Sequence, residues 1–516
     1  MRSVNFTPAV LCAAGLTLLC GSAKAADVVT FAAAGSSAQF INFTTAFLDQ
    51  GYANHYSTGS SSSFQIVDPG APNENAQVAI YWQGSPGNYQ IAVFYQVDSA
   101  VGVRAYFNSD RVTAPTSAAG LPGGANLGFP VAVYPNTTAR DVVPPDEVLQ
   151  AVNGMTVNVG VTDITPEDAR VATERTINLG YSAVNPVKSA VNAASTALPV
   201  RFSLGARPFD LLAIGAAPIL VFTNNNAGSA FASASGANLN IDSFTLAGFL
   251  SGQLNRTSDL ILASGAAQNP VHTYIGEPLS GTYNTMEYTN PESLAKLRFT
   301  NGRQSGSTGA SGGQELNVSA TANNPLNEPA TGAPNGVGGA GRIRVVGDVE
   351  RIKAVANDPV DALGYAFWSI GNFTAQANIR YLTVDGVDPL FDNYTGGSLI
   401  GVGSTGPPFI TFRNVRNGGY PLWSVQRIIV PQDRSITLAN IVAQVRDEGS
   451  GQENFSAMAL RVFRSYHQTP FTVGAVSNGN NDTLANGGDV GGAVFTVNND
   501  LDTFNDFGSE LTNFRQ

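Results

Sequence analysis

A short apolar strand, a loop of small residues and an amphipathic helix follow one another between residues 28 and 47. Val28 to Phe31 is rich in β-branched and aromatic residues, which favour a strand, and three phenylalanines recur at helical spacing over 40–47. Ser36 or Ser37 in the loop is a natural N-cap for that helix. A strand that leads through a tight loop into a helix is typical of α/β folds, so this segment predicts one.

Strand-like and helix-like segments alternate again later in the chain. Val157 to Val161 and Leu211 to Phe222 are compact apolar runs, and Asp242 is placed to cap a helix. A further helix is predicted from Arg342. This alternation favours a parallel or mixed sheet. Later strands are predicted at 362–368, 379–384 and 423–430.

The pattern between residues 68 and 156 differs from this alternation. Gln77 to Trp82, Tyr89 to Val97 and Val101 to Phe107 resemble strands, and turn residues at 84–88 separate the first two. These runs predict antiparallel hairpins. We therefore expect a β-rich insertion at 68–156.

The first 25 residues have the features of a secretory signal. Arg2 precedes a 12-residue apolar run, Ala9 to Cys20, and Ala23-Lys24-Ala25 supplies a small-residue cleavage pattern. Both cysteines of the chain lie inside this segment, so cleavage leaves none for a disulfide. The next apolar stretch, Phe209 to Phe222, is shorter than a membrane span requires. We expect a periplasmic or secreted protein without a membrane span.

Composition and motifs exclude several classes of function. The net charge of −11 argues against nucleic acid, whose binding requires clustered Lys and Arg. The three histidines, His55, His272 and His467, are far apart and lack cysteine partners, so no metal site is predicted. The glycine motifs at 309–313 and 336–341 have no preceding strand, and no base is paired with a serine. We expect neither an enzyme nor a cofactor.

Four short loops rich in hydroxyl groups and glycine remain. They offer small donors, open backbone N–H groups and one carboxylate, which suits a desolvated oxyanion. In open α/β sheets such loops gather at the carboxyl ends of strands, where ligands bind. Ordinary helix capping is the alternative explanation for each loop alone. The candidate residues are Ser36, Ser37, Ser60, Ser61, Thr162, Asp163, Ser280, Gly281 and Thr282.

Five segments resemble one known family in order and local context. Ala33 to Phe40 is similar to its opening Gly-rich loop, Thr162-Asp163 to its Ser-Asp loop, and Tyr274 to Thr282 to its Arg-x-x-x-Ser-Gly-Thr segment. Residues 362–365 and 420–422 look like late core strands. The chain thus resembles the phosphate-binding-protein-like branch of the type 2 periplasmic substrate-binding proteins of ABC transporters, in scattered pieces that cover about half of it.

The resemblance implies two α/β lobes that close on an anion between them. Serine hydroxyls and backbone N–H groups of the four loops would donate to the anion, and Asp163 would accept a hydrogen bond from a ligand hydroxyl, which selects phosphate over sulfate. One position departs from the family: Gly276 stands where the motif carries Arg. Losing such a charged contact weakens binding by about 10- to 100-fold. Arg303 is a candidate replacement.

These inferences predict a two-lobe type 2 periplasmic-binding-protein fold with β-rich insertions and a C-terminal extension. The predicted function is that of an exported solute-binding protein for phosphate or a similar small oxyanion, with an ABC permease as partner. The alternative is an exported surface or interaction protein that has lost anion binding. The predicted units are a signal peptide at 1–25, a first lobe at 26–67, 157–204 and 380–431, an insertion at 68–156, a second lobe at 205–379 with a mobile loop at 301–341, and an extension at 432–516.

Overall fold

A computed structural model of the protein describes its two central α/β lobes. The predicted signal segment, Ser60, Ser61, Gly276 and Arg303 lie outside the described residues. The described residues are 28–52, 54–58, 78–96, 98–107, 119–121, 124–125, 144–152, 157–166, 168–169, 172, 209–226, 228–231, 239–250, 254, 256–260, 269–275, 280–289, 316–318, 346, 349, 361–369, 373, 377–392, 399, 410–432, 441, 443–445, 462–464 and 494–496.

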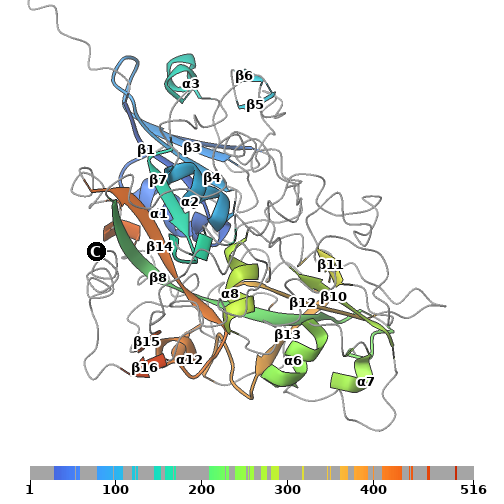
Figure 1. The fold of residues 1–516 in the computed structure, drawn as a ribbon. Coiled ribbons are helices and arrows are strands. Elements are labelled where there is room, and N and C mark those ends of the chain that lie inside the picture. Colours follow the sequence, from blue (N-terminus) through green and yellow to red (C-terminus); the bar gives the residue numbers. More distant parts are fainter. Residues whose placement is uncertain are drawn as a thin grey trace, which may run out of the picture.

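A mixed sheet of twelve strands runs through the molecule (Figure 1). Its main path has the order β11-β10-β12-β8-β14-β7-β1-β4-β3-β2, and β13 pairs with β8 and with β9. The strands are β1 (Val28–Gly35), β2 (Asn54–Thr58), β3 (Val78–Gln83), β4 (Gln90–Gln96), β7 (Val159–Thr162), β8 (Phe209–Asn224), β9 (Asn240–Ile241), β10 (Val271–Ile275), β11 (Leu316–Val318), β12 (Asp361–Phe367), β13 (Ile379–Val384) and β14 (Trp423–Pro431).

Helices cover both faces of this sheet, and two short strand pairs lie apart from it. The pairs are β5 (Ala119–Leu121) with β6 (Gly124–Ala125), and β15 (Val462–Arg464) with β16 (Val494–Thr496). The helices are a 3-10 turn η1 (Ser37–Gln39), α1 (Phe40–Asp49), α2 (Ser99–Phe107), α3 (Asp146–Val152), α6 (Ser243–Leu250), α7 (Thr257–Leu260), α8 (Gly281–Thr289) and α12 (Arg413–Arg416).

The first lobe is built around β1, which pairs in parallel with β4 and with β7. α1 packs on one face of these strands, where the rings of Phe43 and Phe47 lie 5.3 and 5.0 Å from that of Phe31. α2 packs on the opposite face, and its Tyr106 belongs to a different apolar cluster. The phenylalanine spacing in the sequence therefore predicted the buried side of α1 correctly.

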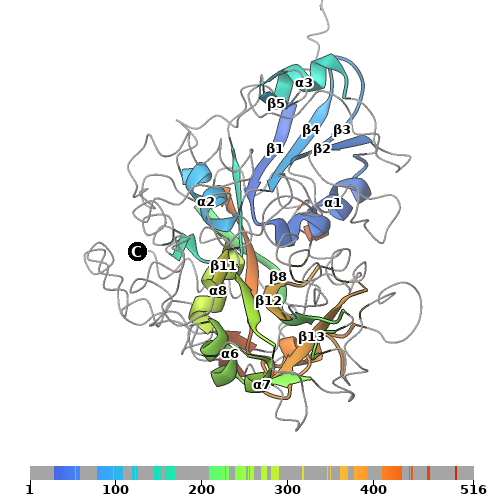
Figure 2. The same ribbon diagram turned by 90° about the vertical axis from the view of Figure 1, so that its right-hand side faces the viewer.

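The second lobe is built on β8, β12 and β10. β10 pairs in parallel with β12, whereas β12 and β13 run antiparallel to β8. β8 has 16 residues and pairs antiparallel with β14, and both strands continue from one lobe into the other (Figures 1 and 2). The chain is thus a two-lobed α/β protein whose lobes share one sheet.

Most predicted elements that fall on described residues are present, but two predictions are wrong. Leu316–Val318, inside the loop predicted at 301–341, form β11, which pairs in parallel with β10. The helix predicted from Arg342 lies largely outside the described residues. Residues 101–107 form α2 and not a strand. All nine residues of α2 are buried, so the sequence shows no polar face at helical spacing, and the alternating valines resemble a strand instead. The two strands predicted before it, now β3 and β4, belong to the main sheet through the pairing of β4 with β1.

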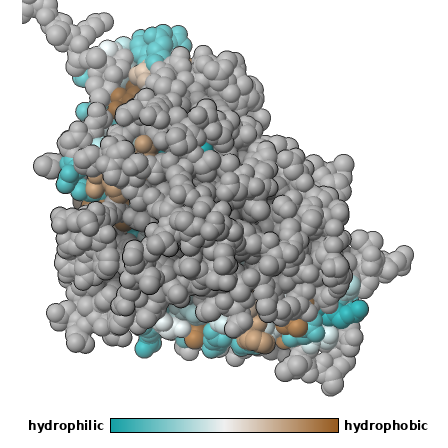
Figure 3. Space-filling model, in the orientation of Figure 1, coloured by the Kyte–Doolittle hydropathy of each residue, from teal (hydrophilic) through white to brown (hydrophobic). Residues whose placement is uncertain are grey.

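The described surface mixes polar and apolar residues. On the face shown in Figure 3, hydrophobic (brown) and hydrophilic (teal) residues are interspersed along the lower edge of the molecule. Phe244 of α6, at 72% exposed, is the large hydrophobic residue that stands out among those described. No helix in the described ranges has both the length and the apolar character needed to cross a membrane.

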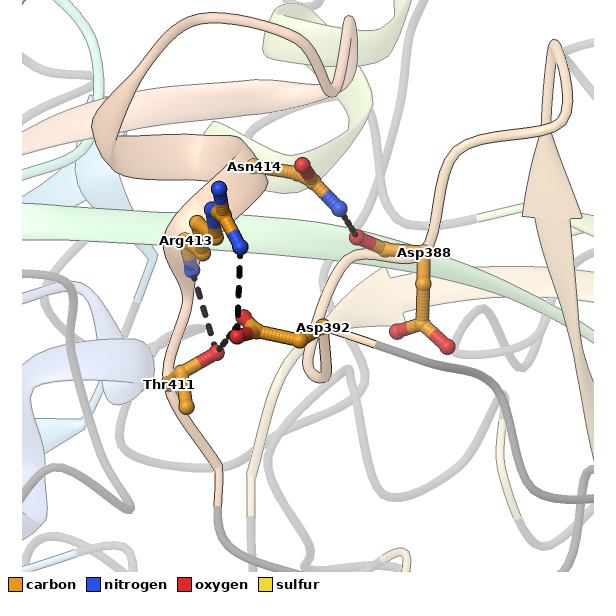
Figure 4. Close-up of polar contacts among 5 residues, drawn as sticks. All are labelled: Asp388, Asp392, Thr411, Arg413 and Asn414. Atoms are coloured by element: carbon orange, nitrogen blue, oxygen red, sulfur yellow. Dashed lines mark hydrogen bonds and ion pairs between the residues drawn. The ribbon is translucent and has the colours of Figure 1, made fainter.

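A group of polar contacts holds the segment between β13 and β14 (Figure 4). The Asn414 amide donates to the Asp388 carbonyl at 3.0 Å, and Thr411 donates to the Asp392 carboxylate at 2.8 Å. Arg413 forms an ion pair with Asp392 at 3.4 Å. These contacts fix the start of α12, after which the chain turns into β14.

The carboxyl group of Asp388 is expected to make stability depend on pH. It accepts from the backbone N–H groups of Leu390 and Phe391 and from the Tyr381 hydroxyl at 2.7–2.9 Å. Burial raises its pKa above the ordinary value of 3.8. The folded state then binds the proton more tightly, so this group's contribution to stability falls as the pH rises above 3.8.

Asp388→Asn is expected to remove this pH dependence, because the amide oxygen keeps both backbone contacts and the amide nitrogen can donate to Tyr381. Urea unfolding at about pH 4 and about pH 7 measures the effect. The stability of the unsubstituted protein relative to the variant should fall between these two values. Parallel pH profiles of the two proteins would contradict this expectation.

Candidate functional site

The carboxyl ends of three neighbouring parallel strands meet at one edge of the first lobe. Ser36 follows β1, Ser99 opens α2 three residues after the end of β4, and Asp163 follows β7. Backbone bonds tie these ends together, since the Ser36 N–H donates to the Val161 carbonyl at 2.9 Å and the Asp98 N–H to the Gly35 carbonyl at 3.3 Å. The topology thus brings three loops together that are far apart in the sequence.

The Asp163 carboxylate lies at the centre of this edge and is 2% exposed. Its Oδ2 accepts hydrogen bonds from the hydroxyl of Ser36 at 2.5 Å and from that of Ser99 at 3.0 Å. Its Oδ1 lies 3.5 Å from the amide nitrogen of Gln39, which donates to it. Two hydroxyl groups, each at the start of a helical segment, therefore converge on one buried carboxylate.

The backbone that carries Asp163 is held from several sides. The Ser424 hydroxyl on β14 donates to the Asp163 carbonyl, and the Gln39 amide donates to the Thr162 carbonyl at 2.8 Å. The Thr162 hydroxyl donates to the Ile164 carbonyl at 2.7 Å. These bonds fix the loop, so the position of the carboxylate is determined by the fold before any ligand arrives.

The start of α8 in the second lobe reaches the same carboxylate. A Cβ atom added to Gly281 would lie 2.4 Å from Asp163 Oδ2 and 2.5 Å from Ser99 Oγ. Side-chain atoms do not approach so closely, so only glycine permits this contact. Ser280, just before it, accepts the Tyr283 N–H at 3.1 Å and caps the helix. The candidate site is therefore made from both lobes.

Most of the candidate residues lie together or beside one another at this edge of the first lobe. Ser36, Thr162, Asp163 and Gly281 meet at the site. Ser37 and Thr282 are half-buried neighbours of Ser36 and Gly281, and Ser280 is the cap of α8. Ser60 and Ser61, predicted as the second donor loop, lie outside the described residues. Sequence reasoning missed Ser99 and Gln39.

A second buried aspartate, Asp361, differs from Asp163 because all of its donors come from one lobe, which is typical of a structural carboxylate. Asp361, at the start of β12, accepts from Asn224, Thr257 and Asn269 side chains and from the Ala230 N–H, at 2.9–3.3 Å. These donors come from the second lobe alone and surround the group. Within the described part of the chain, no group of three or more His, Cys, Asp and Glu is placed to hold a metal ion.

Comparison with known proteins gives structural likenesses only. No family model and no curated protein sequence matches the chain. Among solved structures, the chain is similar to a DING protein at 12% identity, over 83% of this chain and 90% of that one, with a TM-score of 0.35. It is similar to a phosphate-binding protein from Stenotrophomonas maltophilia at 14% identity, over 70% and 79%, with a TM-score of 0.31.

A third likeness is to an ABC-type phosphate transport receptor from Vibrio cholerae, at 13% identity over 48% of this chain and 72% of that one, with a TM-score of 0.27.

Proposed function

We propose that this protein is a solute-binding protein that binds phosphate or a similar small, protonated oxyanion at the edge formed by Ser36, Ser99, Asp163 and Gly281. The observation that supports it is the convergence of two hydroxyl groups and two helix starts, from both lobes, on one buried carboxylate. The ends of parallel strands are where open α/β sheets bind ligands. The proposed role is binding without catalysis.

The hydrogen bonds at Asp163 favour a ligand that carries a proton. A hydroxyl group has one hydrogen, so Ser36 and Ser99 cannot donate to a ligand while they donate to Asp163. When they turn to an anion, Oδ2 of the carboxylate loses two hydrogen bonds, and each lost bond to a charged group costs about 1.5–3 kcal/mol unless another donor replaces it. A ligand hydroxyl supplies that donor, which favours phosphate over sulfate.

The N-terminal ends of two helices at the site carry partial positive charge, which favours an anion there although the chain is acidic. The first N–H groups of a helix have no partner within it, and they carry partial positive charge. α2 and α8 both begin at the candidate site, from opposite lobes. These dipoles favour an anion there even though the net charge of the chain is −11.

The proposed function is tested by calorimetry of the purified protein with phosphate, methylphosphonate and sulfate. We expect heat of binding and a raised melting temperature with phosphate, weaker effects with methylphosphonate, and the weakest with sulfate. The proposal includes export and an ABC permease as partner. Absence of heat and of thermal stabilisation with every anion would contradict it and leave the alternative, an exported interaction protein.

Ser99→Ala is expected to weaken phosphate binding by about tenfold, because one hydrogen bond to a charged group is lost. Ser243→Ala is the matched control. Ser243 also opens a helix, α6, and its hydroxyl donates to an aspartate, Asp385, at 2.5 Å, but it lies in the second lobe whereas Ser99 lies in the first. Calorimetry of both variants measures the difference. Equal affinities of Ser99→Ala and the unsubstituted protein would exclude Ser99 from the site.

A further inference from the structure

The hydroxyl groups and helix dipoles of the candidate site carry only partial charges, so a full positive charge would hold an anion there more strongly. Asp163 and Asp98 both lie at this edge, and Asp98 is 9% exposed. An anion that approaches two carboxylates is repelled unless a cation stands close by, since charges interact strongly where water is excluded. The family resemblance would place an arginine at residue 276, where this chain has glycine.

The side chain of Arg427 leads to this edge from β14. Arg427 is 1% exposed and pairs with Thr162 in the antiparallel ladder between β14 and β7. Its Nη1 donates to the Val425 carbonyl at 2.7 Å, so the side chain runs back along β14. Because the strands are antiparallel, this direction leads past Thr162 toward Asp163. The contact of Ser424 with the Asp163 carbonyl places that part of β14 at the candidate site.

The same register places Arg427 on the face of the sheet that α2 covers. Residues opposite one another in a ladder point to the same face, so Arg427 shares a face with Thr162 and Gly160. A Cβ atom on Gly160 would lie 3.3 Å from the Cβ of Tyr106 in α2. α2 begins at Ser99, which donates to Asp163. The guanidinium and the first turn of α2 therefore lie on one side of the strand ends.

We propose that the guanidinium of Arg427 is the cation that holds the oxyanion at this site, and that it replaces the arginine absent at Gly276. This inference rests on the proposed function. The planar fork of a guanidinium matches two oxygens of a tetrahedral anion, and burial strengthens such charge-assisted bonds. Gln39 fixes the backbone behind it, since its amide donates to the carbonyls of both Thr162 and Arg427 at 2.8 and 3.3 Å.

Arg104 offers a matched control in the same lobe. It is also 1% exposed, and burial lowers its pKa to about 10. It lies two residues after Gly102, where an added Cβ would meet the Ala34 carbonyl at 2.2 Å, so Gly102 faces the sheet. Two residues correspond to about 200° around a helix, so Arg104 points away from the sheet. Both arginines are buried to the same extent, but they lie on different sides of α2.

The test compares the unsubstituted protein with Arg427→Met, Arg427→Lys and Arg104→Met by calorimetry with inorganic phosphate, after thermal melting has shown each to be folded. We expect Arg427→Met to bind about 10- to 100-fold more weakly and Arg104→Met to bind as the unsubstituted protein does. Arg427→Lys should bind at least about fivefold more weakly, because an ammonium group cannot form the fork.

The outcomes separate this inference from the proposed function. If the unsubstituted protein binds no anion, both are overturned. If it binds phosphate and Arg427→Met binds equally well, only the role of Arg427 is overturned. If Arg104→Met weakens phosphate binding as much as Arg427→Met does, the role of Arg427 is also overturned, because the loss of any buried charge would then explain the effect. Where Arg427→Met does not fold, an unchanged affinity of Arg427→Lys overturns the inference.

Discussion

Gly281→Ala is expected to weaken phosphate binding by about 100-fold or more. The new methyl group would lie 2.4 Å from the Asp163 carboxylate and 2.8 Å from its Cβ, and 2.5 Å from the Ser99 hydroxyl. The Asp163 backbone is fixed, so α8 must move away from the first lobe. This movement removes the contacts from at least two donor groups, and each is worth about tenfold in affinity. Calorimetry with phosphate measures the loss.

Gly248→Ala is the control for this change. Gly248 also lies in a helix of the second lobe, α6, and the nearest atoms to an added Cβ there belong to the side chain of Leu254, at 2.6 Å. That side chain can rotate away, so binding should be unchanged. If Gly281→Ala binds phosphate as tightly as Gly248→Ala does, the start of α8 is not part of the binding site. Overpacking at either position costs about 1–3 kcal/mol of stability.

Gly35→Ala is expected to destabilise the protein by more than about 4 kcal/mol. Gly35 ends β1 with φ +149°, a backbone conformation that residues with a side chain rarely adopt. An added Cβ would lie 1.8 Å from the carbonyl oxygen of Val161, which belongs to the backbone of β7 and cannot rotate aside. The variant must separate β1 from β7 or fail to fold, and urea unfolding shows which.

Gly160→Ala is its control in the adjacent strand. Gly160 is paired with Ala34, one residue from Gly35 in the ladder, and its added Cβ would meet side-chain atoms at 3.3–3.4 Å. Those neighbours can give way by a few tenths of an ångström, so a cost of about 1 kcal/mol is expected. Similar stabilities for Gly35→Ala and Gly160→Ala would contradict the close contact of the strand ends.

Local patterns predicted the elements around the site because each is stabilised by neighbours in sequence. The N-cap at Ser36 is one example, since its hydroxyl accepts the Ala38 N–H at 3.2 Å, only two residues away. Asp242 is another, because it accepts the Thr245 N–H at 2.8 Å. The small-residue loops after β1 and β7 also follow from their own composition. Interactions of short range leave their signature in the sequence.

Contacts between residues far apart in the sequence cannot be recognised from local patterns, and some of the residues that such contacts bring to the site were not predicted. Ser99 was missed because α2 is buried on every side and its alternating valines resemble a strand. Arg427 was missed because a single charge in an apolar run says nothing about the partner strand. Its place beside Thr162 comes from an antiparallel ladder between residues more than 260 positions apart. Only the assembled sheet shows which loops share an edge.

The two strands common to both lobes determine how the protein can admit a ligand. β14 pairs with β8 from Phe209 to Pro218, with one register shift between Gln426 and Arg427, and Pro218, opposite Trp423, lacks the N–H that its neighbours contribute. Opening of the two lobes therefore has to bend this pair of strands, and we expect the bend near the register shift or near Pro218. Because this bending distorts hydrogen-bonded strands, we expect the stiffness of the β8–β14 pair to limit how far the two lobes separate.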